Sequence, residues 1–143
     1  MLKLLLNSDA RLVAWAQDVI GCTFFPDACA IGWGDGNEIR AAVVYDRWTQ
    51  ADAHIHLASN GTGHFGSRKF LAAAYHFPFV IAGRRRLTGL VPASNSRALR
   101  LNLHMGFQHE GRLRHAGDDG EDIIILGMLR EDCRFIPRQH RGA

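Results

Sequence analysis

The order of helix-like and strand-like segments is the feature that most constrains how this chain can fold. Three strand-like segments follow one another with no helix between them, and farther along helices and strands alternate before two final strands. In chain order, we expect a helix at 9–20, strands at 28–33, 38–45 and 51–59, a helix at 68–77, a strand at 85–91, a helix at 95–106, and strands at 107–114 and 121–129. This order predicts an α/β fold with one mixed central sheet and helices on both faces.

Local turn signals support these boundaries. The Asp35-Gly36 pair lies between two apolar segments, which is typical of a β-hairpin. Gly106 is expected to end the last helix, and Pro78 is expected to end the helix before it. The segment at 51–59 alternates in polarity, so its polar residues should project from one strand face. These residues are Asp52, His54 and His56.

Length and composition are those of an ordinary globular domain. The chain has 143 residues, of which 47% are hydrophobic, and this fits a single domain over residues 1–143. No apolar run approaches the roughly 20 residues that cross a membrane, and the first residues lack the pattern of a signal peptide. Three cysteines without C-x-x-C spacing indicate free thiols. We therefore expect a cytoplasmic protein with no membrane association.

Positive charge gathers in the C-terminal part of the chain. After residue 80 lie 11 of the 17 basic residues but only seven of the 14 acidic ones, although the net charge of the whole chain is only +3. This favours a local anion site over nucleic-acid binding, which usually requires a longer basic stripe with interleaved aromatic residues. The run at 84–86 consists of three arginines that can contact a phosphate, an acidic substrate or RNA, or form a solvated turn.

A glycine-rich segment at 60–67 joins the strand at 51–59 to the following helix. Its glycines, Gly61, Gly63 and Gly66, allow backbone N–H groups to converge on an anion, and the helix N-terminus adds partial positive charge. The segment lacks the GK[ST] ending of a nucleotide-binding P-loop. An ordinary strand-to-helix turn and a phosphate-binding loop are both consistent with this composition.

Histidines on and after the same strand raise the question of a metal site. His54 and His56 face the same way, and His64 follows closely, but no further ligand is apparent beyond Asp52. No metal is therefore expected. Each strand histidine can instead accept a proton near neutral pH or fill a structural role.

Short motifs near the C-terminus occur in a characteristic order: N-x-x-A, M-G-F, E-G-x-x-R, G-x-D and G-M. Their residues are Asn95, Ala98, Met105, Gly106, Phe107, Glu110, Gly111, Arg114, Gly120, Asp122, Gly127 and Met128. They resemble the C-terminal motif of the GNAT superfamily of acyl-CoA N-acyltransferases. The likeness is closest to the branch that includes ribosomal-protein N-terminal acetyltransferases and small phage-encoded relatives. The family's order of strands and helices also fits from about residue 28 to residue 130.

The resemblance implies an enzyme that moves an acetyl group from acetyl-CoA, its cosubstrate, to a primary amine by direct attack in a ternary complex. In this family, the strand that corresponds to residues 51–59 separates from the strand that corresponds to residues 86–91. The pantetheine arm of the cofactor enters the gap between them. Cofactor-binding residues are then expected at the strand end, in the following loop and before the last helix. They are Leu57, Ala58, Ser59, Gly63, His64, Phe65, Gly66, Ser67, Arg68 and Asn95. A homodimer through the C-terminal strands is also common in the family.

Three residues are candidates for catalysis under this resemblance. His54 or His56 would accept the amine proton, and Asn102 occupies the position, four residues before Gly106, where many members have a tyrosine. An amide can donate a hydrogen bond to the leaving thiolate but no proton. This departure supports a second hypothesis, a non-catalytic acyl-CoA-binding or partner-binding module with the same fold. The basic tail after Phe135 is expected to be loose.

Overall fold

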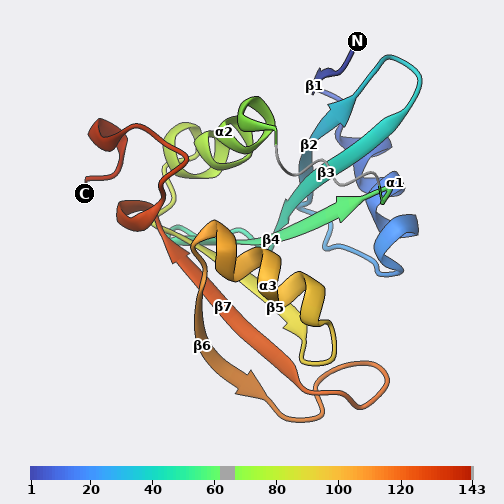
Figure 1. The fold of residues 1–143 in the computed structure, drawn as a ribbon, viewed down its shortest axis with the longest axis vertical. Coiled ribbons are helices and arrows are strands. Elements are labelled where there is room, and N and C mark those ends of the chain that lie inside the picture. The colour runs from blue at the N-terminus through green and yellow to red at the C-terminus, as the bar shows by residue number, and fades with distance from the viewer. Residues whose placement is uncertain (62–66, 143) are drawn as a thin grey trace.

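A computed structural model describes residues 1–61 and 67–142, which form one seven-stranded mixed sheet flanked by helices (Figure 1). The elements are β1 (Lys3–Leu5), α1 (Asp9–Ile20), β2 (Cys29–Gly34), β3 (Ile39–Asp46), β4 (Asp52–Ser59), α2 (Arg68–His76), β5 (Arg86–Pro92), α3 (Ser96–Met105), β6 (Gln108–Leu113) and β7 (Ile123–Leu129). The strand order is β1-β2-β3-β4-β5-β7-β6, in which only the β4–β5 pair is parallel. The predicted α/β fold with a mixed central sheet is confirmed.

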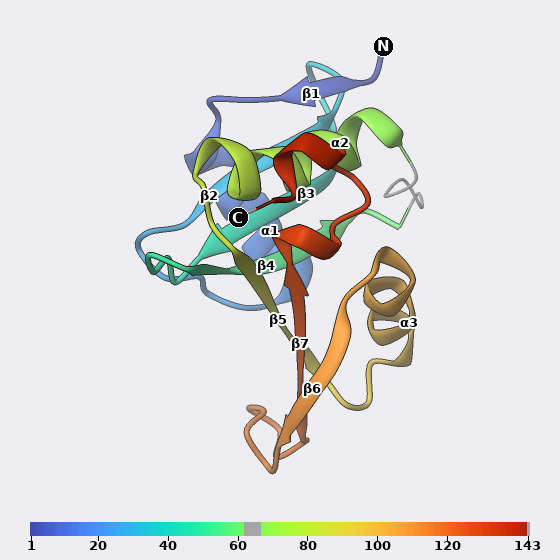
Figure 2. The same cartoon turned by 90° about the vertical axis from the view of Figure 1, so that its left-hand side faces the viewer.

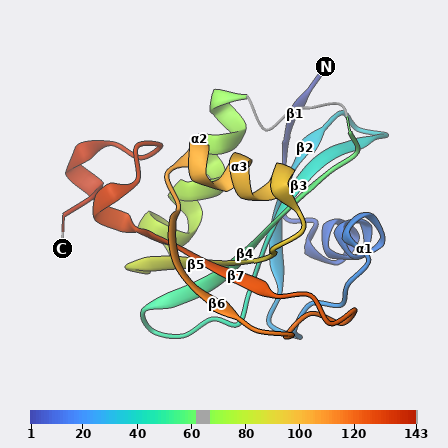
Figure 3. The ribbon, with the colours of Figure 1, turned by 60° about the horizontal axis from the view of Figure 1, so that its bottom comes forward.

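Helices cover both faces of the sheet, as predicted. On one face, Leu12 and Ala16 of α1 pack with Phe24 against the strands β2, β3 and β4. On the other face, Phe70 of α2 and Met105 of α3 belong to the larger core cluster. Figure 3 shows α1 on the opposite side of the sheet from α2 and α3, and Figure 2 shows the C-terminal segment lying against α2. The sheet therefore separates two apolar cores.

The turn residues act as their chemistry predicts. Asp35 accepts hydrogen bonds from the N–H groups of Asn37 (2.8 Å) and Glu38 (2.7 Å), which closes the β2–β3 hairpin. Gly106 ends α3 with φ of 112°, in the left-handed region that a side chain disfavours. Its N–H donates to Leu103 at the end of the helix.

Three predictions about secondary structure were wrong or incomplete. Pro78 does not end the helical segment, because α2 continues into a π-helical turn (Phe77–Ile81) in which proline occupies a first-turn position that needs no N–H donor. The short edge strand β1 was not predicted. The tail after Phe135 is not loose, since Ile136 is buried and its carbonyl accepts a hydrogen bond from Arg141 Nε at 3.0 Å.

Two further expectations concern cysteines and membrane association. All three cysteines are free: Cys22 is exposed, Cys29 half-buried and Cys133 buried. In the residues that the structure describes, no helix has the length and apolar character required to cross a bilayer.

Candidate active site

The parallel strands β4 and β5 separate after a short paired segment. They pair at three positions only, Asp52 with Arg86, Ala53 with Leu87 and His54 with Thr88. Beyond these, β4 stays paired with β3, and β5 stays paired with β7. The two strands diverge as a V in Figure 1. The predicted separation of these strands is confirmed, and residues 57–59 lie on its β4 edge.

The N-terminus of α2 follows the end of β4. The Ser67 hydroxyl accepts a hydrogen bond from the Phe70 N–H at 3.3 Å and so caps the helix. Arg68 and Lys69 have exposed side chains, and within the described chain no acceptor pairs with their first-turn N–H groups. Four of the predicted cofactor-binding residues, Gly63, His64, Phe65 and Gly66, lie outside the described residues.

Asn95 lies directly after β5, at the wide end of the V. Its side-chain oxygen accepts a hydrogen bond from the Ala98 N–H at 3.1 Å, and its own N–H donates to the Pro92 carbonyl at 2.9 Å. Asn95 is therefore the cap of α3, which leaves its exposed side-chain amide N–H groups for other contacts.

Asn102 is turned toward its own helix. The residue is 8% exposed, and its side-chain Nδ2 donates to the Ala98 carbonyl at 2.8 Å. Helix α3 packs on the face that also carries α2. Val44, the partner of His56 in the β3–β4 pair, packs instead in the core beneath α1. The structure therefore brings His54 and His56 to one face of the sheet and Asn102 to the other.

His56 is held by a buried carboxylate. Its Nε2 donates to Asp46 Oδ1 at 2.7 Å, the other oxygen of Asp46 accepts the Phe25 N–H at 3.0 Å, and the ring lies 4.8 Å from the ring of Phe24. Asp46 is only 1% exposed. Burial raises the pKa of Asp46, but the hydrogen bonds from His56 and Phe25 lower this pKa by more, to below its usual 3.8. His56 is thus the hydrogen-bond partner of an ionised carboxylate, so its Nε2 is already occupied.

His54 lies at the vertex of the V and lacks such a partner. Its Nδ1 is buried, and among the described residues no group forms a hydrogen bond with it. Burial, followed by the charge of Arg47, lowers the pKa of His54 below 6.5, against the opposing effect of Asp52 and Asp46. The imidazole is therefore neutral near pH 7, which is the form that can accept a proton.

An ionic network fixes the strands around His54. Thr88, opposite His54, donates its hydroxyl hydrogen to Asp52 at 2.8 Å and accepts from Arg86 Nε at 2.9 Å. Arg86 also forms a bidentate ion pair with Glu110, at 2.8 and 3.1 Å. These residues belong to β4, β5 and β6, so the network spans the sheet on the His54 face.

Gly127 allows this network to cross β7. Glu110 lies at a bulge in β6, and a Cβ atom added to Gly127 would lie 2.2 Å from a carboxylate oxygen of Glu110. The C-terminal motif contains both Glu110 and Gly127, but the contact of Glu110 with Arg86 could not be inferred from the sequence. A glycine in the strand between them, β7, was the available sequence signal for this ion pair.

The Gly127→Ala variant tests this contact. The new methyl group should displace the flexible Glu110 side chain, remove the ion pair with Arg86, and lower the free energy of unfolding by about 1 kcal/mol. Urea denaturation would measure the change. In a Glu110→Ala background the same substitution should cost much less, and an equal cost in both backgrounds would show that Glu110 is not involved.

The sequence raised two further features, metal-ligand groups and the arginine run at 84–86. Within residues 1–61 and 67–142, no three His, Cys, Asp or Glu side chains are grouped as metal ligands. The three arginines at 84–86 have different environments. Arg84 lies over the Trp48 ring, with its Cζ 5.1 Å from the ring centroid, Arg85 lines a cavity described below, and Arg86 pairs with Glu110.

Solved structures with the same fold place the site in context. Neither protein-family models nor curated proteins gave a match to this sequence. A chimera of the spermidine N-acetyltransferase SpeG from Vibrio cholerae and hSSAT superposes with a TM-score of 0.72 at 14% identity, covering 90% of this chain and 95% of the other. A GNAT-family protein from Desulfovibrio desulfuricans gives a TM-score of 0.69 at 17% identity, covering 90% and 99%.

A third structure matches over a shorter region. Mutant forms of the spermidine/spermine N-acetyltransferase SpeG from Vibrio cholerae give a TM-score of 0.62 at 17% identity over 73% of this chain, which spans 65% of theirs. At such identities the similarity establishes the fold. The chain has the fold of GNAT acetyltransferases.

Proposed function

We propose that this protein is an N-acetyltransferase that transfers the acetyl group of acetyl-CoA directly to a primary amine. The observation that carries the proposal is the separation of β4 and β5 after three paired positions, in a chain with the GNAT fold and the ordered C-terminal motif. A gap between two strand edges offers backbone groups to an extended ligand.

The cofactor would lie along the β4 edge of this gap. Backbone groups of Leu57, Ala58 and Ser59 would pair with the pantetheine amides, and Asn95 would flank the arm from the start of α3. The phosphates would be bound where β4 joins α2. There the backbone N–H groups of Arg68 and Lys69, which have no acceptor among the described residues, are proposed contacts, together with Ser67, the Arg68 side chain and the residues 63–66.

His54 would accept the proton of the attacking amine. A neutral imidazole at the vertex of the V can accept the proton of the attacking amine, directly or through one water molecule. His56 is less suited to this step because Asp46 already binds its Nε2. Asn102 can offer its second amide N–H to the departing thiolate, but the thiolate must obtain its proton from another donor.

The acceptor is proposed only as a primary amine. The C-terminal motif resembles the branch with ribosomal-protein N-terminal acetyltransferases, whereas two of the structural matches bear the name of spermidine N-acetyltransferases. A peptide α-amine and a polyamine are therefore the first two acceptors to assay, with release of free CoA thiol as the measurement.

Calorimetric titration with acetyl-CoA tests the cofactor part of the proposal. We expect saturable binding that Ser67→Glu weakens at least about tenfold, because a carboxylate at the first turn of α2 would repel the phosphates. Ser8→Glu places the same charge at the N-terminus of α1 and should leave binding unchanged. Absence of binding to the folded wild-type protein would refute the proposal.

A second candidate function is a non-catalytic acyl-CoA-binding module. It is favoured by the amide of Asn102, which bonds to its own helix where a proton donor would be required. Acetyl-CoA binding without release of thiol across peptide and polyamine acceptors would support this function over the enzyme.

A further inference from the structure

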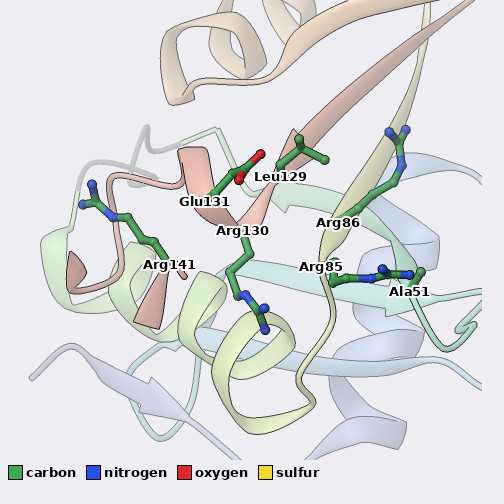
Figure 4. Close-up of a pocket in the computed structure, with 7 residues that line it drawn as sticks. All are labelled: Ala51, Arg85, Arg86, Leu129, Arg130, Glu131 and Arg141. Atoms are coloured by element: carbon green, nitrogen blue, oxygen red, sulfur yellow. The ribbon is translucent and has the colours of Figure 1, made fainter. Parts of the chain in front are cut away.

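A second concave site lies at the other end of the paired β4–β5 segment. A cavity of about 350 Å³ opens where β5 begins and β7 ends, and we call it the arginine cavity. Four arginines line it, Arg85, Arg86, Arg130 and Arg141, with Glu131 as the one acidic lining residue (Figure 4). The three paired positions of β4 and β5 lie between this cavity and the open part of the V.

Most of this positive charge is not neutralised by the protein. Arg86 pairs with Glu110, but Arg85, Arg130 and Arg141 have no ion pair with a carboxylate of the described chain. Arg130 Nε is in addition buried, and no group among the described residues forms a hydrogen bond with it. A buried donor of this kind requires an acceptor, and in proteins an ion or a water molecule commonly supplies one.

Backbone hydrogen bonds connect the segments that line the cavity. The N–H groups of Arg85 and Arg86 both donate to the Ala51 carbonyl, at 2.9 and 3.1 Å, and the Arg130 N–H donates to the Arg85 carbonyl at 2.9 Å. Figure 4 shows the guanidinium groups pointing in different directions. Binding of a ligand would therefore require the arginine side chains to rotate toward it from these backbone positions.

We propose that the arginine cavity binds a small phosphorylated metabolite. Guanidinium groups match phosphate oxygens in bidentate geometry, and arginine stems with Leu129 supply apolar contact for a small organic part. The volume is at the lower end of the range for small-molecule sites, which admits a compact ligand. The cavity lies where β5 begins and β7 ends, and the proposed acetyl-CoA site lies beyond the other end of the paired β4–β5 segment. The cavity is therefore a second ligand site.

Titration of the whole protein with pyrophosphate, followed by amide NMR, tests the proposal. We expect saturable shifts centred on residues 85–86, 129–131 and 141, weakened by added salt. Arg85→Gln and Arg130→Gln should each weaken binding about tenfold, the loss of one charge-assisted hydrogen bond. Arg11→Gln removes the same charge from α1 and should have no effect.

Pyrophosphate could also enter the proposed cofactor site, and Arg68→Gln distinguishes the two locations. Binding that survives this variant, with unchanged shifts near residues 85 and 130, supports the arginine cavity. Shifts confined to the start of α2, or equal weakening by Arg85→Gln and Arg11→Gln, would overturn it. Because the readout needs neither acetyl-CoA nor an acceptor, it is independent of the proposed acetyltransferase activity.

Discussion

Replacement of His54 with glutamine is expected to lower acetyl transfer by about 10² to 10⁴-fold, the usual contribution of a positioned general base. Glutamine keeps the size and polarity of the side chain but cannot accept the amine proton at neutral pH. Because the proposed cofactor contacts are backbone groups at residues 57–59 and the first turn of α2, the affinity for acetyl-CoA should remain unchanged. Thiol release and calorimetry measure the two effects separately.

The pH profile makes this test specific. Burial and Arg47 lower the pKa of His54, so the acidic limb of kcat/KM should lie below pH 6.5, and His54→Gln should remove that limb. His109, an exposed histidine of β6, provides the matched control: His109→Gln should leave rate and profile unaltered. A His54→Gln variant with the wild-type rate and acidic limb would exclude His54 as the base.

Substitution of Asp46 by alanine should produce the largest loss of stability. It leaves the Phe25 N–H and His56 Nε2 without their acceptor, and breaking such a buried arrangement costs about 2–4 kcal/mol. Urea denaturation at pH 7 measures the loss. Asp118→Ala, at an exposed position in the β6–β7 turn, should change stability by less than about 0.5 kcal/mol.

The pH dependence of this loss has a defined sign. The folded-state pKa of Asp46 lies below the usual 3.8, so its ionised form contributes stability above that pH, and the contribution disappears as the pH falls through the lowered pKa. The difference between wild type and Asp46→Asn should therefore shrink as the pH falls below about 3.8. A difference that stays constant with pH would contradict the assignment of an ionised Asp46.

Local chemistry predicted most elements of the fold. The end of the last helix at Gly106 and the Asp35-Gly36 turn each depend on residues that lie near one another in sequence. The position of β7 between β5 and β6 depends instead on pairing between distant segments, for which turn residues give no signal. The prediction that Pro78 ends the helix was wrong for a related reason. A π-helical turn follows α2 and accommodates this proline in its first turn, and the sequence near Pro78 does not indicate that turn.

The candidate site was predicted only in part. The sequence indicated both strand histidines as candidates but could not distinguish them. They differ in their hydrogen bonding, because Asp46 binds His56 and not His54. Asp46 lies ten residues before His56, at the end of an apolar strand. A carboxylate at such a position requires a partner, and this was an available signal. The Thr88–Arg86–Glu110 network depends on a strand order that the sequence did not reveal.

The short contact between β4 and β5 also has a mechanical consequence. The strand ladder consists of two parts, β1 to β4 on one side and β5, β7 and β6 on the other, and the ladder connects them through only three residue pairs of β4 and β5. A ligand that spans the gap would contact the inner edges of both parts at once. Hydrogen exchange along the inner edges of both parts should then slow together when acetyl-CoA is added, so that a substrate would serve as a temporary strand of the sheet.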